Sequence, residues 1–335
     1  TEWKWILSGL TDSILQDKFM EETRVPVYLI TGFLESGKTS FLSFTLQQDY
    51  FQIDGKTLLI LCEEGEEEYD EEALKQCNTV VESIDSEEEL TPERLAAMEI
   101  LHQPERVIIE YNGMWLVSKF EEMEKPEGWG VEQHITCVDA STFQVYMANM
   151  KSLFMDMVRN ADMVIFNRCQ ENDPLPSYRR SIKVVNQRAE IIFEDEEGEL
   201  GDLFEDEMPF DIDAPVIDIL PEDYGIWFVD SMDHPDRYVG KTVHFKARAL
   251  KPRGMGSKFF VPGRTAMTCC ADDTTFLGYI CKSAFAPKIA EGQWVDVTAK
   301  VAFEKRMEYQ GEGIVLYADF VEPCEPLEEE MVYFN

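Results

Sequence analysis

The stretch Gly32-Phe33-Leu34-Glu35-Ser36-Gly37-Lys38-Thr39 decides the fold, because it fits the pattern G-x-x-x-x-G-K-[ST]. The apolar run Val25–Ile30 precedes it directly, and a helix-like segment over 40–48 follows it. Between a strand and a helix, such a loop points its backbone N–H groups at the phosphates of a nucleotide. The sequence therefore predicts a nucleoside triphosphate site. The candidate phosphate-binding residues are Gly32, Glu35, Ser36, Gly37, Lys38, Thr39 and Ser40.

Two side chains of this loop are expected to do chemistry. Lys38 would neutralise β- and γ-phosphate oxygens, and the Thr39 hydroxyl would bind Mg²⁺. The run Val107–Ile109 ends in Glu110, and Gly113 follows three residues later. Glu110 would hold Mg²⁺ directly or through water, and the Gly113 amide would meet the γ-phosphate and move when it leaves. The alternative is that Glu110 is an ordinary acid at a strand end.

Base recognition is expected at the end of a later strand, 163–166, which runs into Asn167-Arg168-Cys169-Gln170. This resembles N-K-x-D, in which the Asp accepts both guanine N1–H and N2–H. The Gln170 carbonyl accepts one such bond, but its NH₂ would face another donor, and an amide pairs equally well with adenine. GTP is therefore the favoured nucleotide, and ATP is the alternative. The cofactor-binding prediction therefore includes Gly113, Asn167, Arg168 and Gln170.

Around these motifs, short apolar runs alternate with helix-length segments in the first half. The runs predict buried parallel strands at 58–61, 107–109, 135–138 and 163–166, with helices at 40–48, 92–102 and 143–160. This order predicts an α/β P-loop domain with a mostly parallel, doubly wound sheet. The second half has apolar alternation at 243–249 and 295–303 and further strand-like runs, so it predicts a small all-β domain, an OB-like barrel.

The chain has 335 residues and a formal net charge of −36, with 44% hydrophobic residues. Residues 215–335 contain 13 basic and 19 acidic residues, a net of −6, so about −30 lies in residues 1–214. That charge excludes non-specific nucleic-acid binding, and no apolar run approaches the ~20 residues that span a bilayer. Eight cysteines without a framework pattern indicate reduced thiols and a cytoplasmic protein. The predicted parts are an N-terminal amphipathic helix (1–24), the P-loop GTPase domain (25–193), an acidic linker (194–214) and the β domain (215–335).

Together, residues 25–195 resemble the CobW-type P-loop GTPases, relatives of the nickel-insertion GTPases. The matching segments are 25–39, 59–66, 109–113, 137–140, 167–170 and 185–192. The resemblance implies a GTPase linked to Zn²⁺, Co²⁺ or a related ion, and it places Glu63 and Glu66 in a mobile segment near Mg²⁺. Lys38, Glu110 and Glu63 are thus the predicted catalytic residues, and Thr39, Glu110 and Glu63 the predicted Mg²⁺ site.

One departure from this family concerns its cargo metal. The family carries Cys-x-Cys-Cys after the Glu63–Glu66 segment, whereas this chain has Cys77 alone there. A single thiolate cannot build a tetrahedral soft-metal site. The adjacent pair Cys269-Cys270 is the remaining candidate for Zn²⁺, and a pair of buried structural thiols is the alternative.

Residues 238–334 resemble the C-terminal domain of YcgQ-type bacterial proteins, which accompany YraQ-type permeases. The matching segments are 239–243, 264–270, 294–298 and 331–334. The combined prediction is an Mg²⁺-dependent GTP-binding and GTP-hydrolysing protein with a permease or metalloprotein partner. The alternatives are a nucleotide-gated binding module with little turnover, and a metallochaperone that carries its cargo on the C-terminal cysteines. The oligomeric state is left open.

Overall fold

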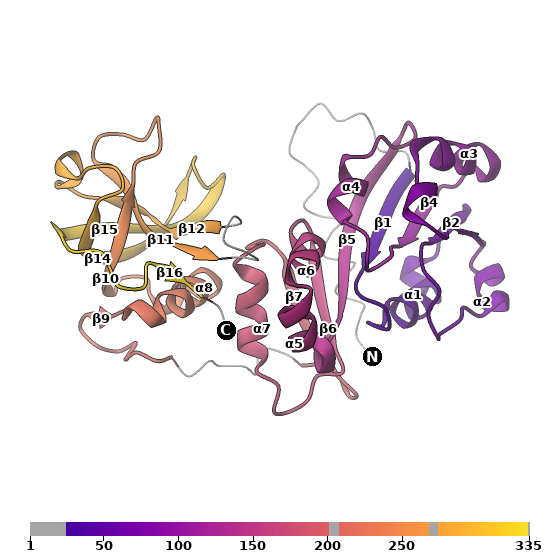
Figure 1. The fold of residues 1–335 in the computed structure, drawn as a ribbon, viewed down its shortest axis with the longest axis horizontal. Coiled ribbons are helices and arrows are strands. Elements are labelled where there is room, and N and C mark those ends of the chain that lie inside the picture. The colour runs from indigo at the N-terminus through magenta and orange to yellow at the C-terminus, as the bar shows by residue number, and fades with distance from the viewer. Residues whose placement is uncertain (1–24, 201–207, 268–273, 334–335) are drawn as a thin grey trace. The chain divides into compact units, whose positions relative to one another are not determined.

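The computed structural model describes residues 25–200, 208–267 and 274–333 of the chain (Figure 1). The predicted N-terminal helix, part of the predicted linker and the pair Cys269-Cys270 lie outside these residues. The described chain forms two compact units. The first contains residues up to Asp173 together with 188–203, and the second contains 174–187 and the residues from 204 onward.

The first unit is built on an eight-stranded sheet with the order β3-β2-β4-β1-β5-β6-β7-β8. All neighbouring strands are parallel except β7 and β8, which form an antiparallel pair. The predicted mostly parallel sheet is confirmed. Its strands are β1 (Val25–Thr31), β2 (Thr57–Leu61), β3 (Thr79–Ser83), β4 (Arg106–Glu110), β5 (Trp129–Asp139), β6 (Met163–Asn167), β7 (Glu190–Asp195) and β8 (Gly198–Glu199).

Helices follow these strands as the apolar periodicity predicts. The helix that leaves the P-loop buries Leu42 and Leu46 in a cluster with Ile30, Ile108 and Ile135 of the sheet. The predicted helix over 143–160 is in fact two helices, which meet at Met150. The helices of the first unit are α1 (Lys38–Leu46), α2 (Glu71–Gln76), α3 (Pro92–His102), α4 (Val117–Glu122), α5 (Ala140–Asn149) and α6 (Lys151–Val158).

The second unit contains a closed five-stranded barrel. The strands pair around it in the order β10-β11-β13-β15-β14, and β14 pairs back to β10. The β13–β15 pair is parallel and the others are antiparallel. The predicted OB-like barrel is confirmed. The strands are β9 (Ile217–Asp218), β10 (Thr242–Leu250), β11 (Phe259–Met267), β12 (Thr274–Gly278), β13 (Ile280–Lys282), β14 (Trp294–Arg306), β15 (Gly311–Pro323) and β16 (Met331–Val332).

Two helices also belong to the second unit: α7 (Leu175–Lys183) and α8 (Tyr224–Asp233). The sequence analysis predicted no helix in this half, because α8 contains the continuous apolar run Ile226–Val229 rather than an alternation of apolar and polar faces. Tyr224 and Trp227 of α8 are buried in the barrel's core cluster. Arg179 and Lys183 of α7 form ion pairs with Asp233 at the end of α8, at 2.9 and 3.4 Å.

The acidic stretch 194–214 is only partly an extended linker. Its first residues complete β7 and pair with β8, where Glu194 lies opposite Glu199. Residues 208–214 follow as bends and turns. Among the described residues, none of the helices has the length and apolar character needed to cross a bilayer.

His244 on β10 contacts a carboxylate on each of the two neighbouring strands, β9 and β14. Its Nδ1 lies 2.6 Å from Asp218 Oδ1 and its Nε2 lies 2.7 Å from Asp296 Oδ1. Partial burial lowers the pKa of His244, but hydrogen bonds and charge from the two carboxylates raise it by more, so its pKa lies above the ordinary 6.5. When the ring is protonated, both of its nitrogens can donate to these carboxylates.

We expect His244→Gln to lower the urea midpoint of the second unit more at pH 5.5 than at pH 9. A raised folded-state pKa gives stability that is complete below the unfolded pKa and is lost as pH rises through the folded pKa. His234→Gln is the control for replacing a histidine in the same unit. A deficit in His244→Gln that is equal at both pH values would contradict the assignment.

Candidate nucleotide site

The loop between β1 and α1 has the backbone geometry that its two glycines allow. Gly32 has φ +141°, and a Cβ there would lie 2.3 Å from the Cys137 carbonyl oxygen. Gly37 has φ +92°, and a Cβ there would lie 2.7 Å from Asn167 Nδ2. Both positions thus require glycine, because a side chain would meet either strain or a neighbouring atom. The loop is closely packed against Cys137 of β5 and Asn167 of β6.

The start of the loop is fixed by a buried polar cluster between β1 and β5. The Thr31 hydroxyl lies 3.0 Å from His134 Nε2 and 2.9 Å from Thr136 Oγ1. Burial lowers the pKa of His134 to about 4, so the ring is neutral at physiological pH. This cluster orients Thr31, the residue before Gly32, without adding charge to the loop.

Lys38 is nearly inaccessible, with 3% of its side chain exposed. Its ammonium donates to the carbonyl oxygens of Gly32 at 3.0 Å and Phe33 at 2.9 Å, and it forms an ion pair with Glu63. A buried ammonium needs such partners, because removing it from water without them is very costly. The predicted phosphate-binding Lys therefore points back across its own loop.

Thr39 and Glu110 come together where the Mg²⁺ site was predicted. The Thr39 hydroxyl donates to Glu110 Oε1 at 2.8 Å, and the Tyr69 hydroxyl donates to Glu110 Oε2. Burial raises the pKa of Glu110, and the hydrogen bonds from Tyr69 and Thr39 and the charge of Lys38 oppose that rise. Glu110 is 4% exposed, and no Lys or Arg of the described chain pairs with it. A buried carboxylate beside a hydroxyl is a donor set that suits a hard divalent cation.

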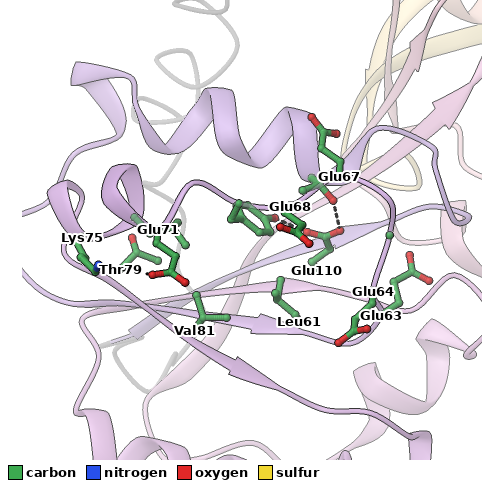
Figure 2. A pocket seen from close by; sticks show the side chains of 14 residues that line it. Leu61, Glu63, Glu64, Glu67, Glu68, Glu71, Lys75, Thr79, Val81 and Glu110 are labelled. Carbon is green, nitrogen blue, oxygen red and sulfur yellow. Dashed lines mark hydrogen bonds and ion pairs between the residues drawn. The ribbon is translucent and has the colours of Figure 1, made fainter.

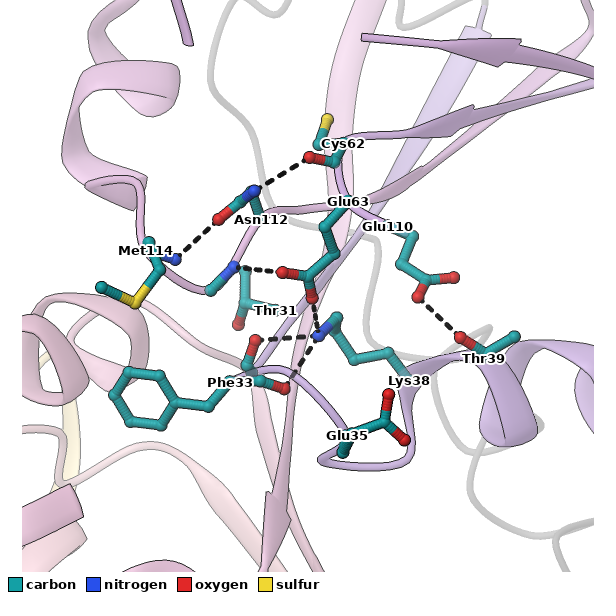
Figure 3. Close-up of polar contacts among 12 residues, drawn as sticks. Thr31, Phe33, Glu35, Lys38, Thr39, Cys62, Glu63, Glu110, Asn112 and Met114 are labelled. Carbon is teal, nitrogen blue, oxygen red and sulfur yellow. Dashed lines mark hydrogen bonds and ion pairs between the residues drawn. The ribbon is translucent and has the colours of Figure 1, made fainter. Parts of the chain in front are cut away.

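Gly113 lies directly against the P-loop, although 74 residues separate it from Thr39. A Cβ on Gly113 would lie 2.5 Å from Gly32 O and 2.7 Å from Phe33 Cα. Its N–H donates to Glu63 Oε2 at 3.3 Å (Figure 3). Asn112 braces the turn, since its side chain donates to Cys62 O at 3.0 Å and accepts from Met114 N at 2.8 Å.

The predicted base-reading residues follow β6 and contact the P-loop from the other side. Asn167 Nδ2 donates to Ser36 O at 2.8 Å, and Arg168 Nη1 donates to Glu35 O at 2.9 Å. Arg168 has φ +56° and also pairs with Asp139, which the sequence did not identify. Gln170 has an exposed side chain, and its backbone N–H donates to Asp173 Oδ2 at 2.8 Å. Asn167 and Arg168 therefore lie next to the phosphate loop, whereas the contact of Gln170 is with Asp173.

The acidic segment after β2 folds over the same loop. Glu66 N donates to Glu35 Oε1 at 2.9 Å, and the Ser40 hydroxyl donates to Glu67. The sequence did not assign a role to Tyr69, and its one signal was an aromatic residue among eight acids between 63 and 72. A cavity of about 530 Å³ opens beside this segment (Figure 2). Its lining combines Leu61, Leu74 and Val81 with the carboxylates of Glu63, Glu64, Glu67, Glu68, Glu71 and Glu110.

The described cysteines are free thiols. The Cys77 thiol donates to Leu46 O at 3.1 Å, and the residue is 8% exposed. Cys281 lies in the barrel core, where burial raises its thiol pKa to about 12. Among the described residues, no group of three or more His, Cys, Asp or Glu side chains is arranged to hold a metal ion.

Comparison with known proteins matches both units. Residues 26–193, half of the chain, match the family model described as CobW/HypB/UreG, nucleotide-binding domain. Residues 201–333 match the model described as DUF1980 C-terminal domain. No curated protein matches the chain.

Two solved structures are similar at low identity. Hydrogenase maturation factor HypB from Archaeoglobus fulgidus is 17% identical, with 52% of this chain and 83% of that chain covered and a TM-score of 0.38. The Zn(II)-bound YjiA GTPase from E. coli is 17% identical, with 77% of this chain and 89% of that chain covered and a TM-score of 0.41.

We expect Gly113→Ala to weaken nucleotide binding at least tenfold, because the added methyl would push on backbone atoms of Gly32 and Phe33. Isothermal titration calorimetry with GTP measures the affinity, and circular dichroism verifies the fold. Gly311→Ala is the matched control, since a Cβ there meets nothing closer than 3.9 Å. Unchanged affinity in Gly113→Ala would show that the turn does not shape the site.

Proposed function

The chain belongs to the CobW/HypB/UreG family of P-loop GTPases, and from this membership we propose that it binds GTP and hydrolyses it with Mg²⁺. One observation carries the proposal: Lys38, Thr39 and Glu110 converge at the mouth of a glycine-built anion loop. Lys38 would bind the β- and γ-phosphates, and the loop's N–H groups would cradle them. The Gly113 N–H would contact the γ-phosphate.

The metal side of the proposed site rests on Thr39 and Glu110. Bound Mg²⁺ would offset the charge that builds on the phosphates during transfer. Thr39 would hold it through its hydroxyl, and Glu110 would hold it directly or through water. Tyr69 would orient the Glu110 carboxylate by the hydrogen bond it already donates. Catalysis would then be mainly positioning and electrostatic stabilisation by these groups.

We further propose that the protein acts in the cytoplasm in metal homeostasis, with a permease or a metalloprotein as its partner. The free thiols of the described chain support a reducing compartment. The family of the first unit supports the link to metals. The barrel unit, which matches the DUF1980 C-terminal domain, is the part proposed to recognise the partner.

We expect phosphate release from GTP by the wild-type protein in Mg²⁺, and a loss of at least a hundredfold in Lys38→Ala. The reason is that Lys38 is the cation buried in the phosphate loop. A coupled phosphate assay measures the rate, with Lys119→Ala as control, because that Lys is exposed and pairs with Glu87. EDTA should abolish turnover. Zero rate in the wild type with intact GTP binding would instead identify a nucleotide-gated binding module.

We expect Gln170→Asp to raise the preference for GTP over ATP at least tenfold. A carboxylate accepts both guanine N1–H and N2–H, whereas the amide of Gln170 presents a donor to one of them. Competition between the two nucleotides in calorimetry measures the ratio. Asn172→Asp, which adds the same charge two residues away, is the control. An equal gain in both variants would show that charge alone, and not base reading at 170, sets the preference.

A further inference from the structure

Glu63 holds its carboxylate between two donors at the mouth of the P-loop (Figure 3). Its Oε1 pairs with the Lys38 ammonium, and its Oε2 accepts the Gly113 N–H at 3.3 Å. The Lys38 side chain is 3% exposed and that of Glu63 is 10% exposed, so the ion pair is almost excluded from water. The sequence analysis assigned Glu63 to Mg²⁺ together with Thr39 and Glu110, and these three residues line one cavity. The contacts of Glu63 with Lys38 and Gly113 are separate from the Thr39–Glu110 hydrogen bond.

In the proposed function, the Lys38 ammonium and the Gly113 N–H are the two groups that bind the γ-phosphate. A P-loop Lys reaches the β- and γ-phosphates, and the amide three residues after the strand-end acid meets the γ-phosphate. A carboxylate is an anion with two acceptor oxygens, so it satisfies the same pair of donors. Both sets of oxygens cannot occupy this place at once.

We propose that Glu63 is a built-in competitor of the γ-phosphate, which occupies its two donors when no nucleotide is bound. The inference rests on the proposed nucleotide site and adds a regulatory contact to it. A nucleoside triphosphate must displace the Glu63 carboxylate from Lys38 and Gly113. A diphosphate has no γ-phosphate, so it leaves the Gly113 contact of Glu63 in place. Glu63 thus lowers the affinity for triphosphate more than that for diphosphate.

Displacement of Glu63 by the γ-phosphate also affects the acidic segment 62–69, which contains Glu63. Three hydrogen bonds hold that segment to its surroundings. The Glu66 N–H donates to Glu35, the Ser40 hydroxyl donates to Glu67, and the Tyr69 hydroxyl donates to Glu110. Glu63, Glu67 and Tyr69 also line the acidic cavity (Figure 2). The outward movement of Glu63 therefore changes the wall of that cavity.

The test compares Glu63→Gln with the wild-type full chain by calorimetry, using a non-hydrolysable imido analogue of GTP and, separately, GDP. We expect Glu63→Gln to bind the analogue at least fivefold more tightly, with a gain for GDP less than half as large, both in EDTA and in Mg²⁺. Glu64→Gln, which removes the same charge from the next residue, should change both affinities less than twofold.

A second variant guards against a folding defect, because neutralising Glu63 leaves the buried Lys38 without its counter-ion. Glu63→Asp keeps the charge but withdraws the oxygens by one methylene, so it cannot reach both donors. We expect it to gain triphosphate affinity by a smaller factor than Glu63→Gln. Thermal unfolding without nucleotide verifies that each variant is folded.

The remaining outcomes overturn the inference in separable ways. An unchanged analogue affinity in folded variants would show that Glu63 does not compete. If the variants lost affinity in Mg²⁺ but not in EDTA, Glu63 would be a Mg²⁺ ligand instead. An equal gain in Glu64→Gln would assign the effect to general charge repulsion. If neither wild type nor variants bind any nucleotide, the proposed function itself fails.

Discussion

The buried ammonium of Lys38 is the constraint on which the nucleotide unit depends. A cation that is 3% exposed needs compensating oxygens, and an uncompensated buried charge costs roughly 3–5 kcal/mol. The loop supplies two carbonyls, and the segment after β2 supplies a carboxylate. Gly32 and Phe33 supply the carbonyl oxygens, and the Gly113 N–H holds the Glu63 carboxylate that pairs with the ammonium.

Many acidic residues surround this buried cation. About −30 of the net charge lies in the first 214 residues, and part of it lines the cavity next to the P-loop. Phosphates approaching this surface would be repelled by Glu67, Glu68 and Glu110 unless cations intervened. A site built on one buried cation amid many carboxylates is therefore expected to depend strongly on divalent metal. Burial is the main reason that the pKa of Glu110 is raised, and the nearby charge of Glu63 adds to that rise.

Local motifs and apolar periodicity predicted most of the first unit. The P-loop, the strand that ends at Glu110 and the motif after β6 were all placed from the sequence, because each depends on residues close together in the chain. The contacts between them were not predicted. Glu63 contacts Lys38 and Gly113, and Tyr69 contacts Glu110, because one loop folds back over another. Such contacts between loops leave no periodic pattern in the sequence. The assignments of Glu63 and Glu110 to Mg²⁺ stay predictions.

The second unit was predicted less completely for a different reason. Alternation along β10 and β14 marks strands with one face in the core, and this led to the barrel. The same rule cannot identify α8, whose Tyr224, Trp227 and Phe228 are buried together, so that no polar face marks a helical period. The division of the chain was also out of reach, because α7 follows a strand of the sheet in sequence but groups with the barrel in space.

That last feature has a consequence for how the two units are inherited. Residues 174–187 leave the sheet after the base-reading motif, join the barrel unit through Arg179 and Lys183, and return as β7. Cutting the chain once, between β7 and the barrel, would separate α7 from Asp233. Residues 174–187 of the second unit would then remain with the first. The halves are therefore not independent cassettes. Residues that precede β7 and residues that follow it in the chain therefore both contribute to the second unit.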